Sequence, residues 1–230
     1  VLWGLASGIM VAASLFGLVR EGLNYGSPLL LVPGLLTGVA LVVVGHEVID
    51  GFEHSPKQFE QADFKKLLLI LGILTIHSFP EGVAVGVSFA ELGLDSAAAG
   101  DTLAVAGVAV PLLAVFMTVA ISIHNVPEGT AIAIPLRSLG VSEPKMVWWA
   151  VFSSLPQPIG AVIAYYFVTL AREFLPFGFG FAAGAMVYLV ATEFVPEALE
   201  YGEGLAWGGK RELLAGGLVG VLAMVPLAFI

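Results

Sequence analysis

Cysteine is absent from the 230-residue sequence, and charged residues make up only 12% of it. Without cysteine the chain forms neither a disulfide nor a thiolate metal site, so a bound metal would need imidazole, carboxylate, amide or carbonyl ligands. Soluble domains carry about 25% charged residues. The scarcity of charge, together with 58% apolar residues and a mean hydropathy of +0.97, predicts an integral membrane protein.

Basic residues are scarcer than acidic ones, nine against eighteen, which gives a formal net charge of −9. Acidic loops that keep the protein soluble explain this charge, and a surface that attracts cations would explain it as well. The sequence also lacks the basic region and the small-residue cleavage site of a signal peptide, although it starts with Val1 inside an apolar run. Because the sequence also starts without an initiator Met, we expect that an earlier segment ahead of Val1 has been removed from it.

Seven apolar segments approach or exceed the length of about 20 residues that a helix needs to cross a bilayer. They are residues 1–19, 28–49, 64–91, 102–136, 145–170, 177–199 and 212–230. The alternating pattern of a β-barrel is missing, so helices remain the only way to satisfy the backbone inside lipid. The predicted fold class is an all-α bundle of seven membrane spans, which forms one domain over residues 1–230.

Lysine and arginine are distributed unevenly among the connections between these segments. Seven of them follow the second, fourth and sixth segments: Lys57, Lys65, Lys66, Arg137, Lys145, Lys210 and Arg211. The alternate connections hold only Arg20 and Arg172. By the positive-inside rule the first set lies in the cytoplasm, which makes residues 51–63 a short cytoplasmic loop and places Ile230 outside.

A six-residue motif occurs twice, as His77-Ser-Phe-Pro-Glu81-Gly and as His124-Asn-Val-Pro-Glu128-Gly. Each copy places a His and a Glu four residues apart, so both side chains lie on one face of a helix, one turn apart. The connection between the two segments is short, which predicts that the two helices are antiparallel neighbours. The four side chains would then converge near the middle of the membrane, as in transporters built from inverted repeats.

The two motif glutamates lie well inside their segments, where a charged side chain costs roughly 2.5 to 3.5 kcal/mol. No Lys or Arg lies in the central part of any segment, so an ion pair with a basic residue does not offset this cost. Two protonated carboxylic acids in a polar core are one explanation, and a bound cation is the other. Two imidazoles and two carboxylates suit Zn²⁺ or Fe²⁺, whereas Ca²⁺ and Mg²⁺ prefer oxygen ligands alone.

The two motifs, followed by Leu155-Pro-Gln-Pro-Ile-Gly-Ala, resemble the ZIP (Zrt-, Irt-like) family of divalent metal transporters in its prokaryotic form. Members of this family have eight spans, with both termini outside, and move Zn²⁺, Fe²⁺, Mn²⁺ or Cd²⁺ into the cytoplasm. The resemblance covers essentially the whole chain. It implies that the first family span is missing here, because the third and fourth segments align with the family's fourth and fifth.

The resemblance further implies a transporter in the cell membrane, with Zn²⁺ as the principal substrate. Its expected partners are the divalent ion, the lipid bilayer and a second copy of the chain in a homodimer, and nucleic acid is not expected. It also implies a centre for two metal ions, whose primary site is formed by His77, Glu81, His124 and Glu128.

A second metal position is expected beside the primary one, lined by Asn125, Ser78 and Gln157. Two of these residues depart from the family pattern. Ser78 stands where many prokaryotic members have Asn, and Gln157 stands where they have Glu between two prolines. Because Gln157 brings no charge to offset repulsion between two divalent ions, we predict that the second position is weak or empty.

Acidic and imidazole side chains also occur at the ends of the second and sixth segments, on the predicted cytoplasmic side. They are His46, Glu47, Asp50, Glu193 and Glu197. Solvation of helix ends at the membrane interface explains such clusters. The resemblance implies instead that they form an exit path for the metal ion.

Two other classes of function have to be distinguished from a transporter. An intramembrane zinc-dependent hydrolase would use a metal-bound water and a glutamate base, but it would favour HExxH or an asymmetric ligand set, and the chain has neither. A metal-dependent receptor or scaffold would bind the ion without accumulating it in liposomes. We predict a transporter, which is not an enzyme.

Overall fold

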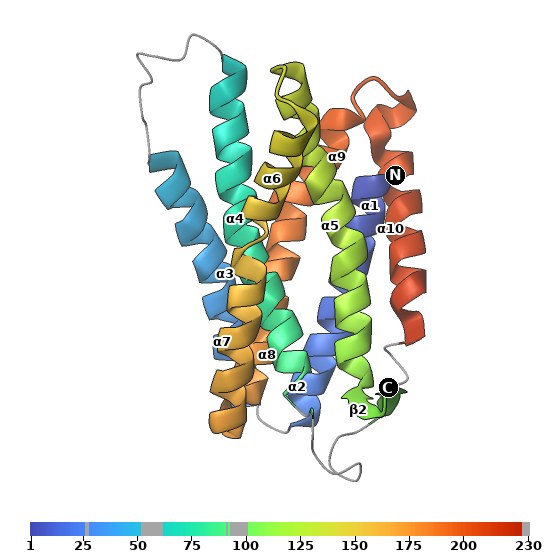
Figure 1. Cartoon of the computed structure of the whole chain (residues 1–230). Coiled ribbons are helices and arrows are strands. Elements are labelled where there is room, and N and C mark those ends of the chain that lie inside the picture. The colour runs from blue at the N-terminus through green and yellow to red at the C-terminus, as the bar shows by residue number, and fades with distance from the viewer. Residues whose placement is uncertain (26–27, 52–61, 91, 93–100, 227–230) are drawn as a thin grey trace.

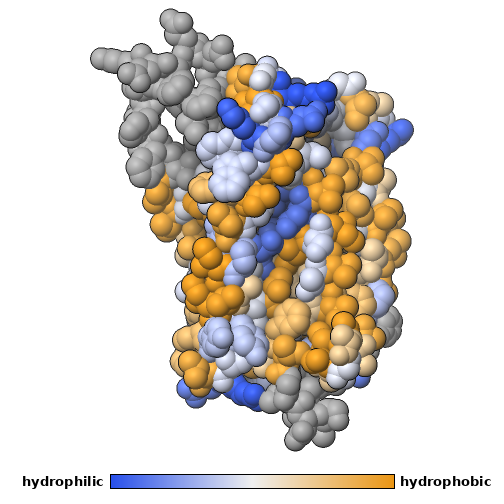
Figure 2. Space-filling model, viewed as in Figure 1, coloured by the Kyte–Doolittle hydropathy of each residue, from blue (hydrophilic) through white to orange (hydrophobic). Residues whose placement is uncertain are grey.

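The chain forms a bundle of long helices that run roughly along one axis (Figure 1). The computed structural model describes residues 1–25, 28–51, 62–90, 92 and 101–226. Apolar side chains cover most of the lateral surface in view, whereas hydrophilic side chains collect at the two ends (Figure 2). This distribution is the one expected of helices embedded in lipid.

Ten α-helices are described. They are α1 (Leu2–Ala12), α2 (Arg20–Asn24), α3 (Pro28–Gly51), α4 (Ala62–Ser88), α5 (Leu112–Ser138), α6 (Glu143–Ser153), α7 (Pro156–Leu170), α8 (Leu175–Leu189), α9 (Val195–Tyr201) and α10 (Lys210–Met224). Two π-helical segments, η1 (Ala13–Val19) and η3 (Val190–Phe194), join α1 to α2 and α8 to α9. Short 3-10 turns, η2 (Arg172–Phe174) and η4 (Ala206–Gly209), precede α8 and α10.

Five helical stretches of the described residues are long and apolar enough to cross a membrane. They are Leu2–Asn24, Pro28–Val48, Leu112–Ser138, Glu143–Leu170 and Arg172–Tyr201. The prediction of a polytopic helical membrane protein is confirmed to this extent. The first helical stretch is longer than predicted, because it continues through Arg20 instead of turning after residue 19. The predicted loop at 51–63 falls mainly on residues outside the described part of the chain.

The prediction for residues 102–136 is wrong at its beginning, because residues 102–111 are not helical. Thr102–Val105 (β1) and Val108–Pro111 (β2) form an antiparallel hairpin. Valine and threonine favour strands, and Ala106 and Gly107 between them have φ values of 50° and 83°, as a two-residue hairpin turn requires. The all-α prediction therefore missed a hairpin at the start of the second motif-bearing helix.

Glycines allow three pairs of helices to approach closely. The pairs are α1 with α10, α3 with α8, and α4 with α7. In each pair, a Cβ atom added to a glycine of the first helix would overlap a backbone carbonyl oxygen of the second: Gly8 with Gly217, Gly38 with Phe181, and Gly82 with Gln157. In each pair a second contact of this kind lies four residues away on both helices, so the paired helices run in the same direction. Small residues at this spacing let helix backbones pack in contact inside a membrane.

The helices α4 and α5 lie side by side in the bundle and run in opposite directions, as predicted from the short connection between the two motif-bearing segments (Figure 1). Both remain helical through their motif prolines, Pro80 and Pro127. Buried side chains of α1, α4, α5 and α8 form the main apolar core around them, including Met10, Ala84, Met117 and Met186. The packing therefore holds the two motif faces at the centre of the protein.

Alanine substitutions test the close contact between α1 and α10. We expect Gly8→Ala to lower stability by about 1 to 3 kcal/mol, because its methyl group has to displace the backbone at Gly217. The matched control is Gly217→Ala, whose Cβ would meet only the carbonyl oxygen of Gly4 at 3.7 Å. Thermal unfolding of both purified variants measures the difference. Equal melting temperatures would show that the two helices are not in backbone contact.

Candidate metal centre

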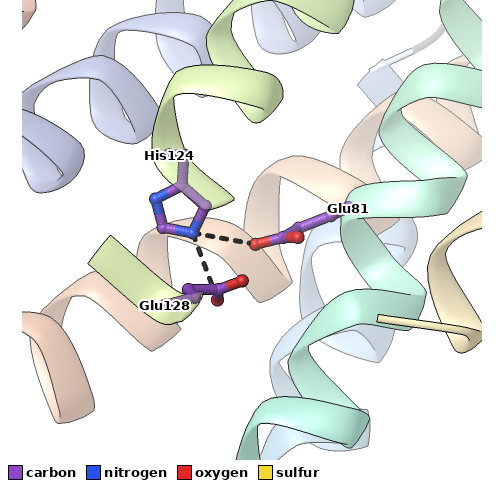
Figure 3. A group of neighbouring side chains, drawn as sticks. All are labelled: Glu81, His124 and Glu128. Carbon is purple, nitrogen blue, oxygen red and sulfur yellow. Dashed lines mark ion pairs between the residues drawn. The ribbon is translucent and has the colours of Figure 1, made fainter. Parts of the chain in front are cut away.

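Three titratable side chains from α4 and α5 converge between these helices (Figure 3). Glu81 comes from α4, and His124 and Glu128 come from successive turns of α5. The Nε2 atom of His124 lies 3.0 Å from Oε1 of Glu81 and 3.3 Å from Oε1 of Glu128. Ligands bound to a tetrahedral ion at about 2.0 to 2.1 Å are spaced about 3.4 Å apart. The two distances from Nε2 of His124 are therefore close to the spacing of ligands in one coordination sphere, and all three ligand atoms lie within 4.8 Å of one another.

These three side chains are almost completely withdrawn from the surface. Glu81 and His124 are 0% exposed, and Glu128 is 5% exposed. Oε1 of each glutamate and Nε2 of His124 contact one another, and these atoms have no further hydrogen-bond partner among the described residues. Two buried carboxylates are costly unless their charge is offset, and one imidazole offsets at most one of the two charges. A divalent cation would engage all three atoms and offset both carboxylate charges, so the donor set fits a metal ion.

Gln157, at the start of α7, connects this group to Asn125. Its side-chain Nε2 donates a hydrogen bond of 3.0 Å to Oε2 of Glu81, and its Oε1 accepts one of 3.1 Å from Nδ2 of Asn125. One oxygen of Glu81 is thereby occupied by an amide, while the other faces His124. Two of the residues predicted for a second metal position are thus hydrogen-bonded to each other.

Ser78, the third residue predicted for the second position, lies against the break between α6 and α7. Its hydroxyl donates a hydrogen bond of 3.1 Å to the carbonyl oxygen of Ser153, the last residue of α6. The helix is interrupted there, and α7 restarts at Pro156. Non-helical backbone at membrane depth has to be enclosed by protein, and α4 supplies that cover at this carbonyl.

His77 is buried on α4 at 1% exposure but is not among the three converging side chains. Its Nε2 atom lies 3.4 Å from Nε2 of His46 on α3. The same atom of His46 lies 3.3 Å from Oε1 of Glu193 in η3. The structure thus joins two residues of the predicted exit path to one residue of the predicted primary site.

The remaining residues of the predicted exit path lie near the same helix ends. Glu47 is exposed on α3, and Glu197 is half-buried on α9. Asp50 belongs to the last turn of α3, but its side chain is outside the described part of the structure. Within this predicted set, His46 and Glu193 contact each other.

Sequence reasoning missed Phe194, which packs on the centre. Its ring stacks on the imidazole of His124, with ring centroids 4.8 Å apart and planes inclined by 28°. Phe194 follows Glu193 in the π-helical segment η3, so adjacent residues of one segment contact His124 and His46. Single-turn π segments occur frequently at functional sites. A single phenylalanine in an apolar segment does not indicate from the sequence alone that it contacts a histidine of another helix.

A model of one protein family, described as ZIP Zinc transporter, matches residues 45–228. The chain belongs to the ZIP zinc transporter family. Both motif copies and every residue of the centre described above lie within the matched range. This confirms the resemblance drawn from the repeated motif. It also agrees with the prediction that the chain is not an enzyme, because the family is one of transporters.

Three curated ZIP proteins illustrate the similarity. Zinc transporter GufA of Myxococcus xanthus is 33% identical over 188 residues, which cover 76% of this chain and 65% of that protein. Zinc transporter ZupT of Corynebacterium aurimucosum is 31% identical over 218 residues, 87% of this chain and 76% of that protein. Zinc transporter ZIP11 of Homo sapiens is 34% identical over 143 residues, 62% of this chain and 39% of that protein. The chain therefore spans less than two thirds of the length of GufA and of ZIP11.

Replacing one ligand with its uncharged isostere tests the ZIP metal centre. We expect Glu81→Gln to weaken Zn²⁺ binding by more than about 100-fold, since even partners outside the first ligand sphere typically contribute about 10-fold to 100-fold. Glu143→Gln is the matched control, because Glu143 is exposed at the start of α6 and away from the three-residue group, and it should leave the affinity unchanged. Titration calorimetry of the purified proteins measures both. Equal affinities of Glu81→Gln and the unsubstituted protein would contradict the assignment.

Proposed function

We propose that this chain is a carrier that moves divalent transition-metal ions, Zn²⁺ above all, across the membrane into the cytoplasm. The observation that supports this most directly is the group of Glu81, His124 and Glu128, buried between two central membrane helices. Mixed nitrogen and oxygen donors suit Zn²⁺, and they also accept Fe²⁺, Mn²⁺ or Cd²⁺. The ion is the substrate of the carrier, and the names of the related GufA, ZupT and ZIP11 proteins point to zinc.

The direction of transport follows from the proposed orientation in the cell membrane. We infer seven membrane spans, which are the five apolar stretches together with α4 and α10. The last turns of α3, α5 and α9 lie together at one end of the bundle in Figure 1. Seven of the nine basic residues belong to the sequence between α3 and α4 or to the ends of the helices that border the connections at this end, which favours a cytoplasmic location for it.

The contacts of His77 support an exit path toward that end. His77 lies one helical turn before Glu81 on α4, and its imidazole contacts His46, which in turn contacts Glu193. A side chain placed between two groups of ligands is suited to pass an ion from one group to the other. We therefore retain His77 as the fourth ligand of the loaded primary site and assign His46 and Glu193 to the next position toward the cytoplasm.

The hydrogen bonds of Gln157 support a carrier that binds one ion at a time. Its neutral amide occupies Oε2 of Glu81 and the side chain of Asn125, which are groups that a second ion would need. The hydroxyl group of Ser78 donates a hydrogen bond to the carbonyl oxygen of Ser153. A second divalent ion a few ångströms from the first would be strongly repelled and would find no additional charge at this position.

Transport by reconstituted protein tests the proposal. We expect Glu81→Ala and His124→Ala to abolish Zn²⁺ uptake into proteoliposomes while expression stays near normal, because each substitution removes a ligand. Glu193→Ala should reduce the rate of uptake more than the apparent affinity, since this residue lies beyond the primary site.

Two further outcomes of the uptake assay are informative. Glu143→Ala, at the exposed start of α6, is a control that should transport normally. If the unsubstituted protein bound Zn²⁺ tightly but never accumulated it in liposomes, the chain would be a metal-dependent receptor or scaffold. Uptake at the full rate by Glu81→Ala would eliminate the proposed primary site.

Anomalous diffraction at the zinc edge tests the number of ions. At micromolar Zn²⁺ we expect one peak of full occupancy beside His124, and two full peaks would refute the one-ion proposal. In the Gln157→Glu variant a second peak should appear near Asn125, because the substitution supplies the missing charge. If no second peak appears in that variant, residue 157 does not face the second position.

A further inference from the structure

The imidazole of His124 is central to the three-residue group, but its second ring nitrogen does not hold it in place. Its Nε2 atom faces Oε1 of Glu81 and of Glu128 (Figure 3). A metal-binding histidine usually donates the N–H of its other ring nitrogen to a neighbouring acceptor, and this hydrogen bond orients the ring. The Nδ1 atom of His124 is buried and has no hydrogen-bond partner among the described residues. The protein therefore has to orient this ring by packing.

The orientation of the ring decides whether His124 can bind an ion together with the two glutamates. The electron pair on Nε2 lies in the plane of the imidazole, so rotation of the ring about its Cβ–Cγ bond turns this pair away from the carboxylates. The distribution of this torsion angle is broad in histidine, so the angle itself resists rotation only weakly. Glu81, by contrast, is held by the hydrogen bond that Gln157 donates to its Oε2 atom.

The phenyl ring of Phe194 lies on the face of this imidazole. The ring centroids are 4.8 Å apart and the planes are inclined by 28°, which is a stacked arrangement of the kind that aromatic pairs favour. Phe194 also contacts the indole of Trp3 in α1, with ring centroids 5.3 Å apart. It is only 2% exposed, so its own ring has little room to move. A confined ring on the face of the imidazole opposes rotation of the imidazole out of its plane.

We propose that Phe194 is a positioning residue of the metal centre. Its ring holds the imidazole of His124 in the plane in which Nε2 faces Glu81 and Glu128. A phenyl ring offers no ligand atom, so Phe194 acts on the ion only through His124. A ligand that is oriented before the ion arrives loses less freedom on binding, and the ion is bound more tightly as a result. This proposal rests on the metal-carrying function proposed above.

The corresponding histidine of the first motif has a different neighbour. The imidazole of His77 lies 5.7 Å from the imidazole of His46, and the two planes are inclined by 53°. Its Nε2 atom faces His46, and His77 is not part of the three-residue group. The stacked phenyl ring thus accompanies the histidine that converges with the two glutamates.

Filling space in the apolar core is the alternative role for Phe194, because it belongs to the main core cluster. Phe179 of α8 provides the comparison. It is also 2% exposed and belongs to the same cluster, but its aromatic partner is Tyr25, with ring centroids 6.1 Å apart. Loss of the phenyl ring should therefore lower stability to a similar extent at both positions, whereas only the loss at Phe194 should free a metal ligand.

Titration of the purified protein with Co²⁺ distinguishes the two roles, because the visible absorption of bound Co²⁺ depends on the number and arrangement of its ligands. We expect Phe194→Leu to weaken Co²⁺ binding by about 10-fold to 100-fold, as substitutions of residues that orient a ligand typically do. It should also change the absorption spectrum at saturating Co²⁺. The matched control Phe179→Leu should leave affinity and spectrum unchanged while lowering the melting temperature to a similar extent. Phe194→Tyr keeps the ring and should retain the affinity and spectrum of the unsubstituted protein.

Three results would overturn the proposal. If Phe194→Leu bound Co²⁺ with the affinity and spectrum of the unsubstituted protein, Phe194 would only fill space. The same conclusion would follow if Phe179→Leu had the same effect as Phe194→Leu. If the unsubstituted protein did not bind Co²⁺ at all, the metal centre itself would be wrong, and the positioning role with it. That last result is distinct from the first two, in which the centre binds the ion and only the role of Phe194 fails.

A second ringless variant covers the case in which Phe194→Leu does not fold. Phe194→Met also removes the ring, and its flexible side chain adapts to the shape of an irregular space in the core. It should show the same loss of Co²⁺ affinity and the same change of spectrum. Binding equal to that of the unsubstituted protein would overturn the positioning role.

Discussion

The contact between His124 and two buried carboxylates is the interaction on which the arrangement of the central helices depends. Glu81 and Glu128 lie in a bundle of apolar helices, and no described contact places a lysine or arginine beside them. The imidazole of His124 and a bound divalent cation can offset the negative charge of these carboxylates without a lysine or an arginine. Because the two glutamates come from different helices, this requirement links α4 to α5. In the proposed carrier, these residues would hold the ion during its passage across the membrane.

Backbone contacts through glycine determine where this centre lies relative to the other helices. Lipid provides no hydrophobic driving force between helices, so close packing has to hold them together. The contact between Gly82 and Gln157 places α7 directly on the motif of α4, which is why a side chain of α7 reaches Glu81 at all. The same glycine that permits packing therefore sets the hydrogen bonding of a metal ligand. On α5 the corresponding glycine is open, and the two halves of the repeat differ in consequence.

Three elements approach the two motif helices from outside and give each ligand a different neighbour. The start of α7 supplies an amide to Glu81, the π-helical segment η3 supplies an aromatic ring to His124, and α3 supplies a second imidazole to His77. The two similar motifs thus contribute three residues to the centre, whereas the fourth, His77, contacts His46 instead. In the proposed carrier, this asymmetry would favour movement of an ion from the centre toward the end of the bundle that contains Glu193.

The sequence by itself determined the class of protein and the antiparallel relation of the two motif helices. It also predicted that all four motif side chains converge, of which the structure brings together Glu81, His124 and Glu128 but not His77. These predictions follow from hydropathy and from a His and Glu spacing of one helical turn, which are local properties. The sequence did not determine the hairpin at residues 102–111, where a short apolar stretch is compatible with either strand or helix. Only the tertiary structure decided that His77 contacts His46, that Gln157 binds Glu81 and Asn125, and that Phe194 stacks on His124. Spacing within one helix defines a face, whereas the rotation and approach of neighbouring helices decide which groups that face meets.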